Sequence, residues 1–157
     1  MARSNTIKLP LTDHERKQLR RQKIKIRELT HYAPDELEGI LDIDSERARL
    51  LYGLAAFQQI PSVGIKFAED LTFLGLYSLV DLRGKDPASL IHAYELKKGY
   101  WTDPCVEDQF WLAIHVAETG DYSKQWWDFT STRKAYRSQN GYPRDRPKTA
   151  WFDVPDR

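Results

Sequence analysis

The sequence contains one cysteine, Cys105, among 157 residues, so a disulfide within the chain is excluded. Proteins without disulfides are typical of reducing compartments, and we expect a cytoplasmic protein. Hydrophobic runs are short, and none approaches the roughly 18 residues that a membrane span needs. The first residues lead into no apolar segment, so we expect neither a secretory signal nor a membrane partner.

Signatures of catalysis and of cofactor binding are also missing. Four scattered histidines and one cysteine give no metal-ligand spacing. The chain has no G-x-x-x-x-G-K loop, no G-x-G-x-x-G turn and no nucleophile elbow around a serine. Cys105 lies at a predicted helix start, which favours a thiolate, but the neighbouring Asp103 and Glu107 oppose it. We therefore predict no cofactor, no metal and no enzymatic activity, with Cys105 a small packing residue.

Charge is unevenly distributed, although the formal net charge is only +1. Residues 8–27 carry eight basic and two acidic side chains, whereas residues 35–46 carry six acidic and no basic ones. Residues 133–157 carry seven basic and three acidic side chains. Two basic flanks therefore surround an acidic centre, whose carboxylates we interpret as solvated side chains rather than metal ligands.

Helical patterns flank the segment 59–66. Apolar residues at helical spacing predict one helix over residues 47–58 and another over 65–74. Pro61 ends the first helix because proline fixes its own φ and disfavours the α conformation at Ile60. We expect Gly64 to permit a tight turn and the close approach of another molecule, because it has no Cβ. Ile60 and Val63 are then predicted to point inward and join the two helices.

The start of the second helix is a predicted phosphate site. Backbone N–H groups at a helix start lack intrahelical acceptors, and Lys66 adds a positive charge. We therefore predict a helix-hairpin-helix motif that binds the DNA phosphate backbone. The candidate residues are Pro61, Ser62, Val63, Gly64, Ile65 and Lys66, together with Arg20 and Arg21 of a basic helix near the N-terminus. The alternatives are a hairpin that joins helices or binds a protein, and a basic helix that is merely solvated.

An internal repeat with an offset of 20 residues predicts a second hairpin. The matching pairs are Ile40 and Ile60, Ile43 and Val63, Ala48 and Ala68, and Leu51 and Leu71. Asp44 falls where Gly64 stands, and with Asp42 it repels phosphate. We interpret this first hairpin as structural and as part of a tandem helical unit with a shared core.

The remaining patterns are helical until the C-terminal region. Helix starts are predicted by the capping box of Thr12 and Glu15, and before Pro34, Pro87, Pro104 and Ser131. Residues 121–157 interleave aromatic and basic side chains. These rings either stack on unpaired bases or anchor an extended segment to the protein core, with the basic heads left in water. We favour anchoring.

The predicted architecture is all-α: a tandem helix-hairpin-helix bundle with extra C-terminal helices and an extended aromatic-rich tail. We expect a flexible tail over residues 1–11, a helix-hairpin-helix domain over 12–120, and an aromatic and basic extension over 121–157 packed on it.

Three stretches carry a resemblance to a known family. They are F-Q-Q-I-P-S-V-G at 57–64, D-P-C-V-E-D-Q-F at 103–110 and W-W-D-F-T at 126–130, followed by R-K-A-Y-R at 133–137 and N-G-Y-P at 140–143. Over roughly residues 12–153 the chain resembles the small bacterial helix-hairpin-helix proteins of the "pathogenicity locus" family, some of which carry a mitomycin-resistance label. The resemblance implies DNA binding without catalysis. Trp111 departs from the basic residue expected there, which removes one phosphate contact.

The functional hypothesis is a DNA-binding protein without sequence preference, acting as an accessory factor in DNA repair or DNA metabolism. The alternative is a protein–protein interaction module on the same helical scaffold.

Overall fold

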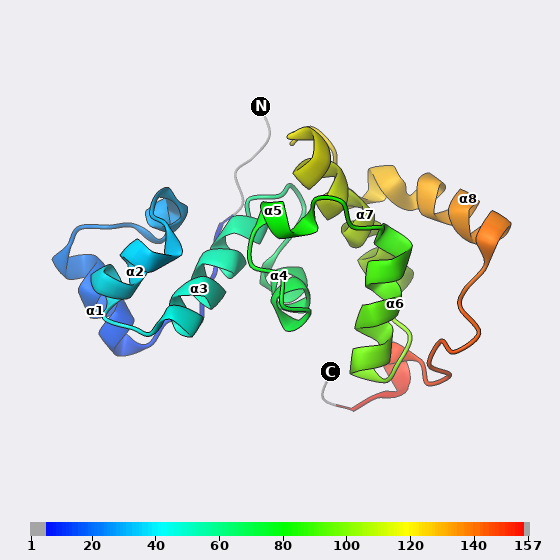
Figure 1. Ribbon diagram of the computed structural model, residues 1–157, viewed down its shortest axis with the longest axis horizontal. Coiled ribbons are helices and arrows are strands. Elements are labelled where there is room, and N and C mark those ends of the chain that lie inside the picture. Colours follow the sequence, from blue (N-terminus) through cyan, green and yellow to red (C-terminus); the bar gives the residue numbers. More distant parts are fainter. Residues whose placement is uncertain (1–5, 156–157) are drawn as a thin grey trace. The chain divides into compact units, whose positions relative to one another are not determined.

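A computed structural model describes residues 6–155, which form α-helices and short 3-10 helices (η) (Figure 1). The elements are α1 (Asp13–Arg21), η1 (Ile26–His31), α2 (Pro34–Leu41), α3 (Ser45–Phe57), α4 (Ile65–Phe73), α5 (Leu79–Leu82), α6 (Pro87–Lys98), α7 (Pro104–Thr119), η2 (Trp126–Phe129), α8 (Thr130–Asn140) and η3 (Trp151–Asp153). Within 6–155 no β-strand occurs, and one isolated parallel bridge joins Trp101 to Ala150. The prediction of an all-α fold is confirmed, and its helix-hairpin-helix detail stays a prediction.

The chain divides into two compact units, residues 1–81 (unit 1) and 82–157 (unit 2), with the boundary inside α5. The sequence predicts domain boundaries after residues 11 and 120, which differ from the division after residue 81. The predicted domain organisation stays a prediction.

Local sequence signals set the helix ends. Thr12 and Glu15 form the predicted capping box, since each side chain accepts a hydrogen bond from the other's backbone N–H. Asp86 and Asp103 cap α6 and α7 through their carboxylates. Gly120 ends α7 in the left-handed conformation, with φ of 70°.

Helix α3 is the centre of unit 1 and packs against α2, η1 and α4. Leu51, Leu54 and Phe57 of α3 are fully or almost fully buried, and burial of each such side chain stabilises the fold by about 1.5–3 kcal/mol. A Cβ added at Gly53 would lie 3.0 Å from the Cα of Tyr77, so only glycine lets these two segments come so close.

The segment before α1 is bound to α3. Gln58 accepts a hydrogen bond from the Lys8 backbone N–H at 2.9 Å and donates one to the Lys8 carbonyl at 2.7 Å. Leu9 is buried, and Arg47 donates to the Pro10 carbonyl at 2.6 Å. Residues 1–5 of the predicted flexible tail lie outside the described residues, whereas its residues 8–10 belong to the packed part of unit 1.

Helix α7 is the centre of unit 2 and packs against α6, η2 and α8. Its apolar stripe is buried at Phe110, Ala113, Ile114 and Ala117, as its helical spacing predicts. The same helix buries two carboxylates, which the sequence pattern did not predict.

Candidate nucleic-acid interface

The turn between α3 and α4 brings residues 61–66 together. Ile60 and Val63 are 0% and 2% exposed, so both point into the core of unit 1 as predicted. The Val63 N–H donates to the Ile60 carbonyl at 3.1 Å, which closes the turn. Ser62 occupies its outer side with φ of 61°. The turn is thus fixed from inside by apolar side chains.

Gly64 does not make the tight bend, so the predicted conformational reason for this glycine is wrong. It lies just before α4 with φ of −103° and ψ of −170°, a conformation that any residue adopts. The left-handed position is Ser62 instead. An added Cβ at Gly64 would meet no atom of residues 6–155 within 4 Å, so the described part of the chain does not require glycine there.

Gly64 leaves the start of α4 without a side-chain cap. Within the described residues the N-cap position forms no side-chain cap hydrogen bond, and the first N–H groups of a helix have no intrahelical acceptor. Gly64 and Lys66 are exposed, and Ile65 is half-buried. Backbone donors and a positive charge therefore lie together at one helix start, the arrangement that binds phosphate.

The start of α3 is built in the opposite way. Asp44 caps it, because its carboxylate accepts a hydrogen bond from the Arg47 N–H at 2.8 Å. This carboxylate is both an acceptor and a negative charge at the position that corresponds to Gly64 in the repeat. The Asp44 carboxylate therefore takes the place at the start of α3 that an external anion would take.

Two segments distant in sequence flank the turn. Lys8 binds Gln58 through its backbone, and its side chain is exposed. Gln59 donates to the Thr30 hydroxyl at 2.6 Å, which places η1 beside the turn. Sequence reasoning did not place Lys8 at the site, since contacts across 50 residues carry no local signal.

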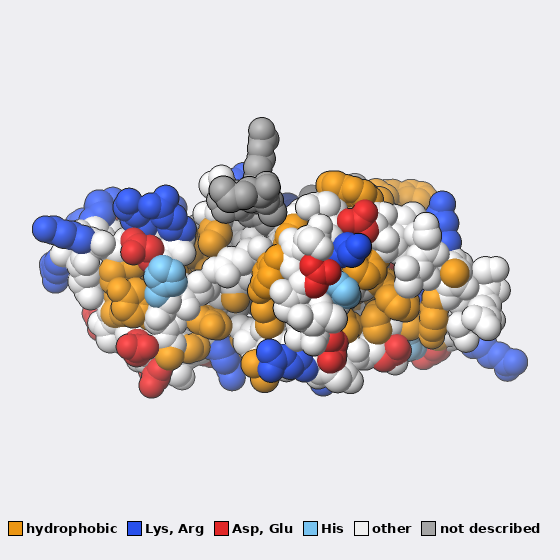
Figure 2. Space-filling view, turned by 90° about the horizontal axis from the view of Figure 1, so that it is seen from above, with side chains coloured by type: hydrophobic (Ala, Val, Ile, Leu, Met, Phe, Trp, Pro, Cys, Tyr) orange, Lys and Arg blue, Asp and Glu red, His pale blue; other side chains and the backbone are white. Residues whose placement is uncertain are grey.

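Arg20 and Arg21 are not brought to the turn. Both are exposed in the last turn of α1, which packs against α2. Helix α1 lies by the beginning of α3, whereas the turn follows the end of α3 (Figure 1). Lys and Arg side chains gather over the α1 end of unit 1 (Figure 2, left). The predicted contacts thus form two separate groups.

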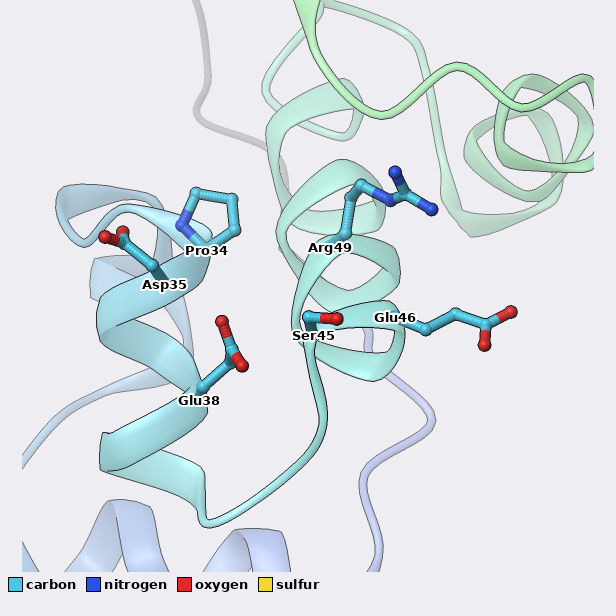
Figure 3. A pocket seen from close by; sticks show the side chains of 6 residues that line it. All are labelled: Pro34, Asp35, Glu38, Ser45, Glu46 and Arg49. Atoms are coloured by element: carbon cyan, nitrogen blue, oxygen red, sulfur yellow. The ribbon is translucent and has the colours of Figure 1, made fainter.

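Acidic side chains line a cavity of about 490 Å³ between α2 and α3. Its lining includes Asp35, Glu38 and Glu46, with Arg49 as the basic member. Glu38 extends from α2 toward α3, and Glu46 points away from α2 (Figure 3). Three carboxylates make this surface unfavourable for phosphate. Among the residues that the structure describes, no group of three or more potential ligands is placed to hold a metal ion.

Buried ion pairs bind the C-terminal segment to α6 and α7. Arg146 forms a bidentate pair with Glu95, with N–O distances of 2.8 and 3.0 Å. Arg137 donates to Glu107 at 3.1 Å, and Arg133 donates to Asp108 at 2.8 Å. The three carboxylates are Glu95, Glu107 and Asp108, each at most 1% exposed.

The prediction that the basic heads of this segment stay in water is therefore wrong for three arginines. A buried carboxylate requires a paired cation, and Arg133, Arg137 and Arg146 supply it. The hydrogen bond to Asp108 raises the pKa of Arg133. Burial, aided by the hydrogen bond to Glu107, raises the pKa of Tyr142, which keeps its hydroxyl protonated as a donor.

The aromatic rings contact the chain itself. The backbone at these residues is also bound: the main-chain N–H of Trp101 donates to the Thr149 carbonyl, and the main-chain N–H of Trp151 donates to the Trp101 carbonyl, both at 2.9 Å. Trp101 and Phe152 meet edge to face, with ring centroids 5.6 Å apart. Trp111, at the position where the family resemblance predicts a basic residue, packs against Tyr136. These contacts agree with the interpretation of the rings as anchors.

A second cavity, of about 380 Å³, lies between α6 and the end of α8. Ser89 in its wall donates to Asp86 at 2.8 Å rather than to a histidine. His92 pairs with Asp145 through Nε2 at 3.0 Å, while its Nδ1 is buried without a partner within the described residues. The hydroxyl of Ser89 is thus not oriented by an imidazole base, as a serine nucleophile would be.

Cys105 is exposed in the first turn of α7. Partial desolvation of the sulfur and the charge of Asp103 raise its pKa, which disfavours the reactive thiolate that a helix start promotes. Over residues 6–155, no helix has the length and apolarity needed to cross a membrane.

Fold and site together define an all-α protein with an uncapped, cationic helix start in its N-terminal unit. The family model of the pathogenicity locus (Cdd1) family matches residues 51–135, from α3 into α8. The chain belongs to this family, and the resemblance predicted from the motifs is confirmed. A relative from Streptomyces lavendulae, "Mitomycin resistance protein McrB", is 30% identical over 83 residues, which cover 53% of this chain and 78% of the relative. No solved structure gives a significant match.

Proposed function

We propose that this protein binds DNA without sequence preference, through phosphates held at the start of α4. The turn would act as a helix-hairpin-helix motif, with the N–H groups after Gly64 as donors and Lys66 as the cation. A role as a non-enzymatic accessory factor in DNA repair or DNA metabolism, in the cytoplasm, is part of this proposal.

One observation carries it: the start of α4 is exposed, uncapped and basic, whereas the equivalent start of α3 is capped by Asp44. A helix start without its own acceptor binds an external anion, and phosphate is the anion that DNA repeats along its length. Lys66 and Lys8, whose backbone binds Gln58 at the end of α3, add positive charge to this region.

The test is a fluorescence-anisotropy titration of a labelled duplex with the full chain. We expect the double variant Gly64→Val, Lys66→Glu to lose binding, because the valine covers the backbone and the glutamate repels phosphate. The space at Gly64 is open, so the variant should keep its helicity in far-UV circular dichroism.

A matched control carries Gly39→Val and Lys85→Glu, the same two changes at exposed positions outside residues 61–66. The side chain added at residue 39 also meets no atom within 4 Å. This control should bind as the wild type does. Equal binding by both variants would remove the turn from the proposal.

The second candidate is a protein-interaction module, and the acidic cavity between α2 and α3 favours it. A partner with a basic segment would suit the three carboxylates there. Enrichment of one protein after nuclease treatment, lost on Glu38→Lys, together with no DNA binding at about 50 mM salt, would support this candidate over the first.

A further inference from the structure

Seven exposed basic side chains lie on α1 and on the segment that follows it. This basic face consists of Arg16, Lys17, Arg20, Arg21, Lys23, Lys25 and Arg27, and all seven residues are exposed. No ion pair to an acidic side chain occurs at any of them within residues 6–155. Their charge is therefore available to an external anion.

The opposite side of α1 is anchored. Glu15 and Leu19 are 2% and 4% exposed, and the Glu15 carboxylate pairs with Arg47 of α3 at 2.9 Å. Gln22 donates to the Ile40 carbonyl at 2.7 Å. The cations are thus carried by a helix that is already fixed, which lowers the entropy lost on binding.

The α1 part of the basic face and the turn lie near opposite ends of α3 (Figure 1). Helix α3 has 13 residues, which corresponds to a length of about 20 Å. A rigid partner that presents phosphates over such a distance can contact both groups at once. Double-stranded DNA is stiff over about 150 base pairs and carries a phosphate every 3.4 Å along each strand.

Aromatic side chains distinguish a duplex from a single strand as the partner. Proteins that hold single strands stack the bases on exposed rings. Residues 12–31 contain no Phe, Trp or Tyr. In the described part of the chain, the most exposed aromatic side chains all belong to unit 2: Tyr122, Trp127, Tyr142 and Phe152. The basic face therefore offers charge without a stacking platform.

We infer that the basic face is a second phosphate-binding surface, and that unit 1 holds one DNA duplex across this face and the turn. The inference rests on the proposed DNA binding and adds the partner class and the extent of the contact. The family match begins at residue 51, so it says nothing about the basic face.

The test compares the full chain with a variant in which Arg16, Lys17, Arg20 and Arg21 are all changed to Gln. Glutamine keeps the helix propensity, and the buried residues of α1 are untouched. A control of equal charge changes Lys85, Lys124, Lys134 and Lys148 to Gln, all exposed in unit 2. Each protein is titrated into a labelled 24-bp duplex and a 24-nucleotide single strand over a salt series.

The slope of log K against log salt should become less negative by about 3 to 4 in the basic-face variant, because each lost phosphate contact removes roughly 0.9. The control should keep the wild-type slope, and the duplex should bind more tightly than the single strand. An unchanged slope in the basic-face variant, or tighter binding of the single strand, would overturn the inference.

A third variant, Gly64→Asp, separates this inference from the proposed function. Loss of binding in Gly64→Asp with an unchanged slope in the basic-face variant would leave the proposed function standing and the inference refuted. Full binding by Gly64→Asp with a reduced slope in the basic-face variant would refute the proposed role of the turn, and with it a duplex held across both surfaces, and would leave the basic face as the phosphate-binding surface. No DNA binding by the wild-type chain would refute both.

Discussion

Removal of Arg137 should leave a buried charge without its main partner. The Glu107 carboxylate is fully buried and accepts from Arg137 at 3.1 Å and from the Tyr142 hydroxyl at 2.7 Å, while Arg146 approaches to 3.8 Å. Breaking a buried pair from one side destabilises a protein by about 3–5 kcal/mol. Two partners of Glu107 remain in Arg137→Ala, so we expect the lower end of that range, about 3 kcal/mol.

Urea unfolding followed by tryptophan fluorescence measures this loss in unit 2. The five tryptophans all belong to that unit: Trp101, Trp111, Trp126, Trp127 and Trp151. Lys134→Ala, exposed on the same helix, should change the free energy of unfolding by no more than about 0.5 kcal/mol.

The double variant Arg137→Ala, Glu107→Gln should recover part of the loss, because the buried charge is gone. If Arg137→Ala unfolds at the same urea concentration as Lys134→Ala, the ion pair does not stabilise unit 2 and this reasoning fails.

Three further results are expected. Gly64→Asp should raise the stability of unit 1 by about a few tenths of a kcal/mol through a new helix cap, since glycine is itself a tolerated N-cap residue, and yet abolish DNA binding; a loss of both would point to unfolding instead. The hydrogen bond to Arg47 lowers the pKa of Glu15 below 4.5. Wild type should therefore be more stable than Glu15→Gln above that pH, and this difference in the free energy of unfolding should disappear as the pH falls through the lowered pKa. A difference that does not change with pH, measured by urea unfolding followed by circular dichroism, would contradict this. Cys105, with its raised pKa, should react slowly with iodoacetamide at pH 7, and Cys105→Ser should bind DNA unchanged; rapid alkylation would show a reactive thiolate.

The helices of this chain could be predicted from sequence because their end signals are local. Thr12 and Glu15 are three residues apart, and Asp86 and Asp103 each precede a proline at the first helical position. The inward direction of Ile60 and Val63 also follows from a short pattern around Pro61. All these features depend on residues within one turn of each other.

The role of Gly64 was only partly predictable. A glycine after an apolar-proline turn suggests a left-handed residue, but the structure places that conformation at Ser62. Gly64 matters because it has no side chain that could cap the start of α4. The sequence repeat already indicates this difference, since Asp44 stands at the equivalent position before α3.

The buried carboxylates were not predicted, because acidic residues on a helix are usually solvated. Glu107 and Asp108 pair with Arg137 and Arg133, residues 30 and 25 positions away. One signal was available: basic residues at 133 and 137 lie four apart, on one face of α8. Only the fold shows that this face meets α7.

If unit 1 binds the phosphate backbone of duplex DNA, the affinity depends on salt and not on base sequence. The most direct measurement is the affinity of the wild-type chain for a 24-bp duplex of arbitrary sequence, by anisotropy between about 50 and 200 mM salt. We expect a linear decrease of log K with log salt, with a slope of about −0.9 for each phosphate contacted, and equal affinity for a second unrelated sequence. Absence of binding at about 50 mM salt, or an affinity independent of salt, would contradict it.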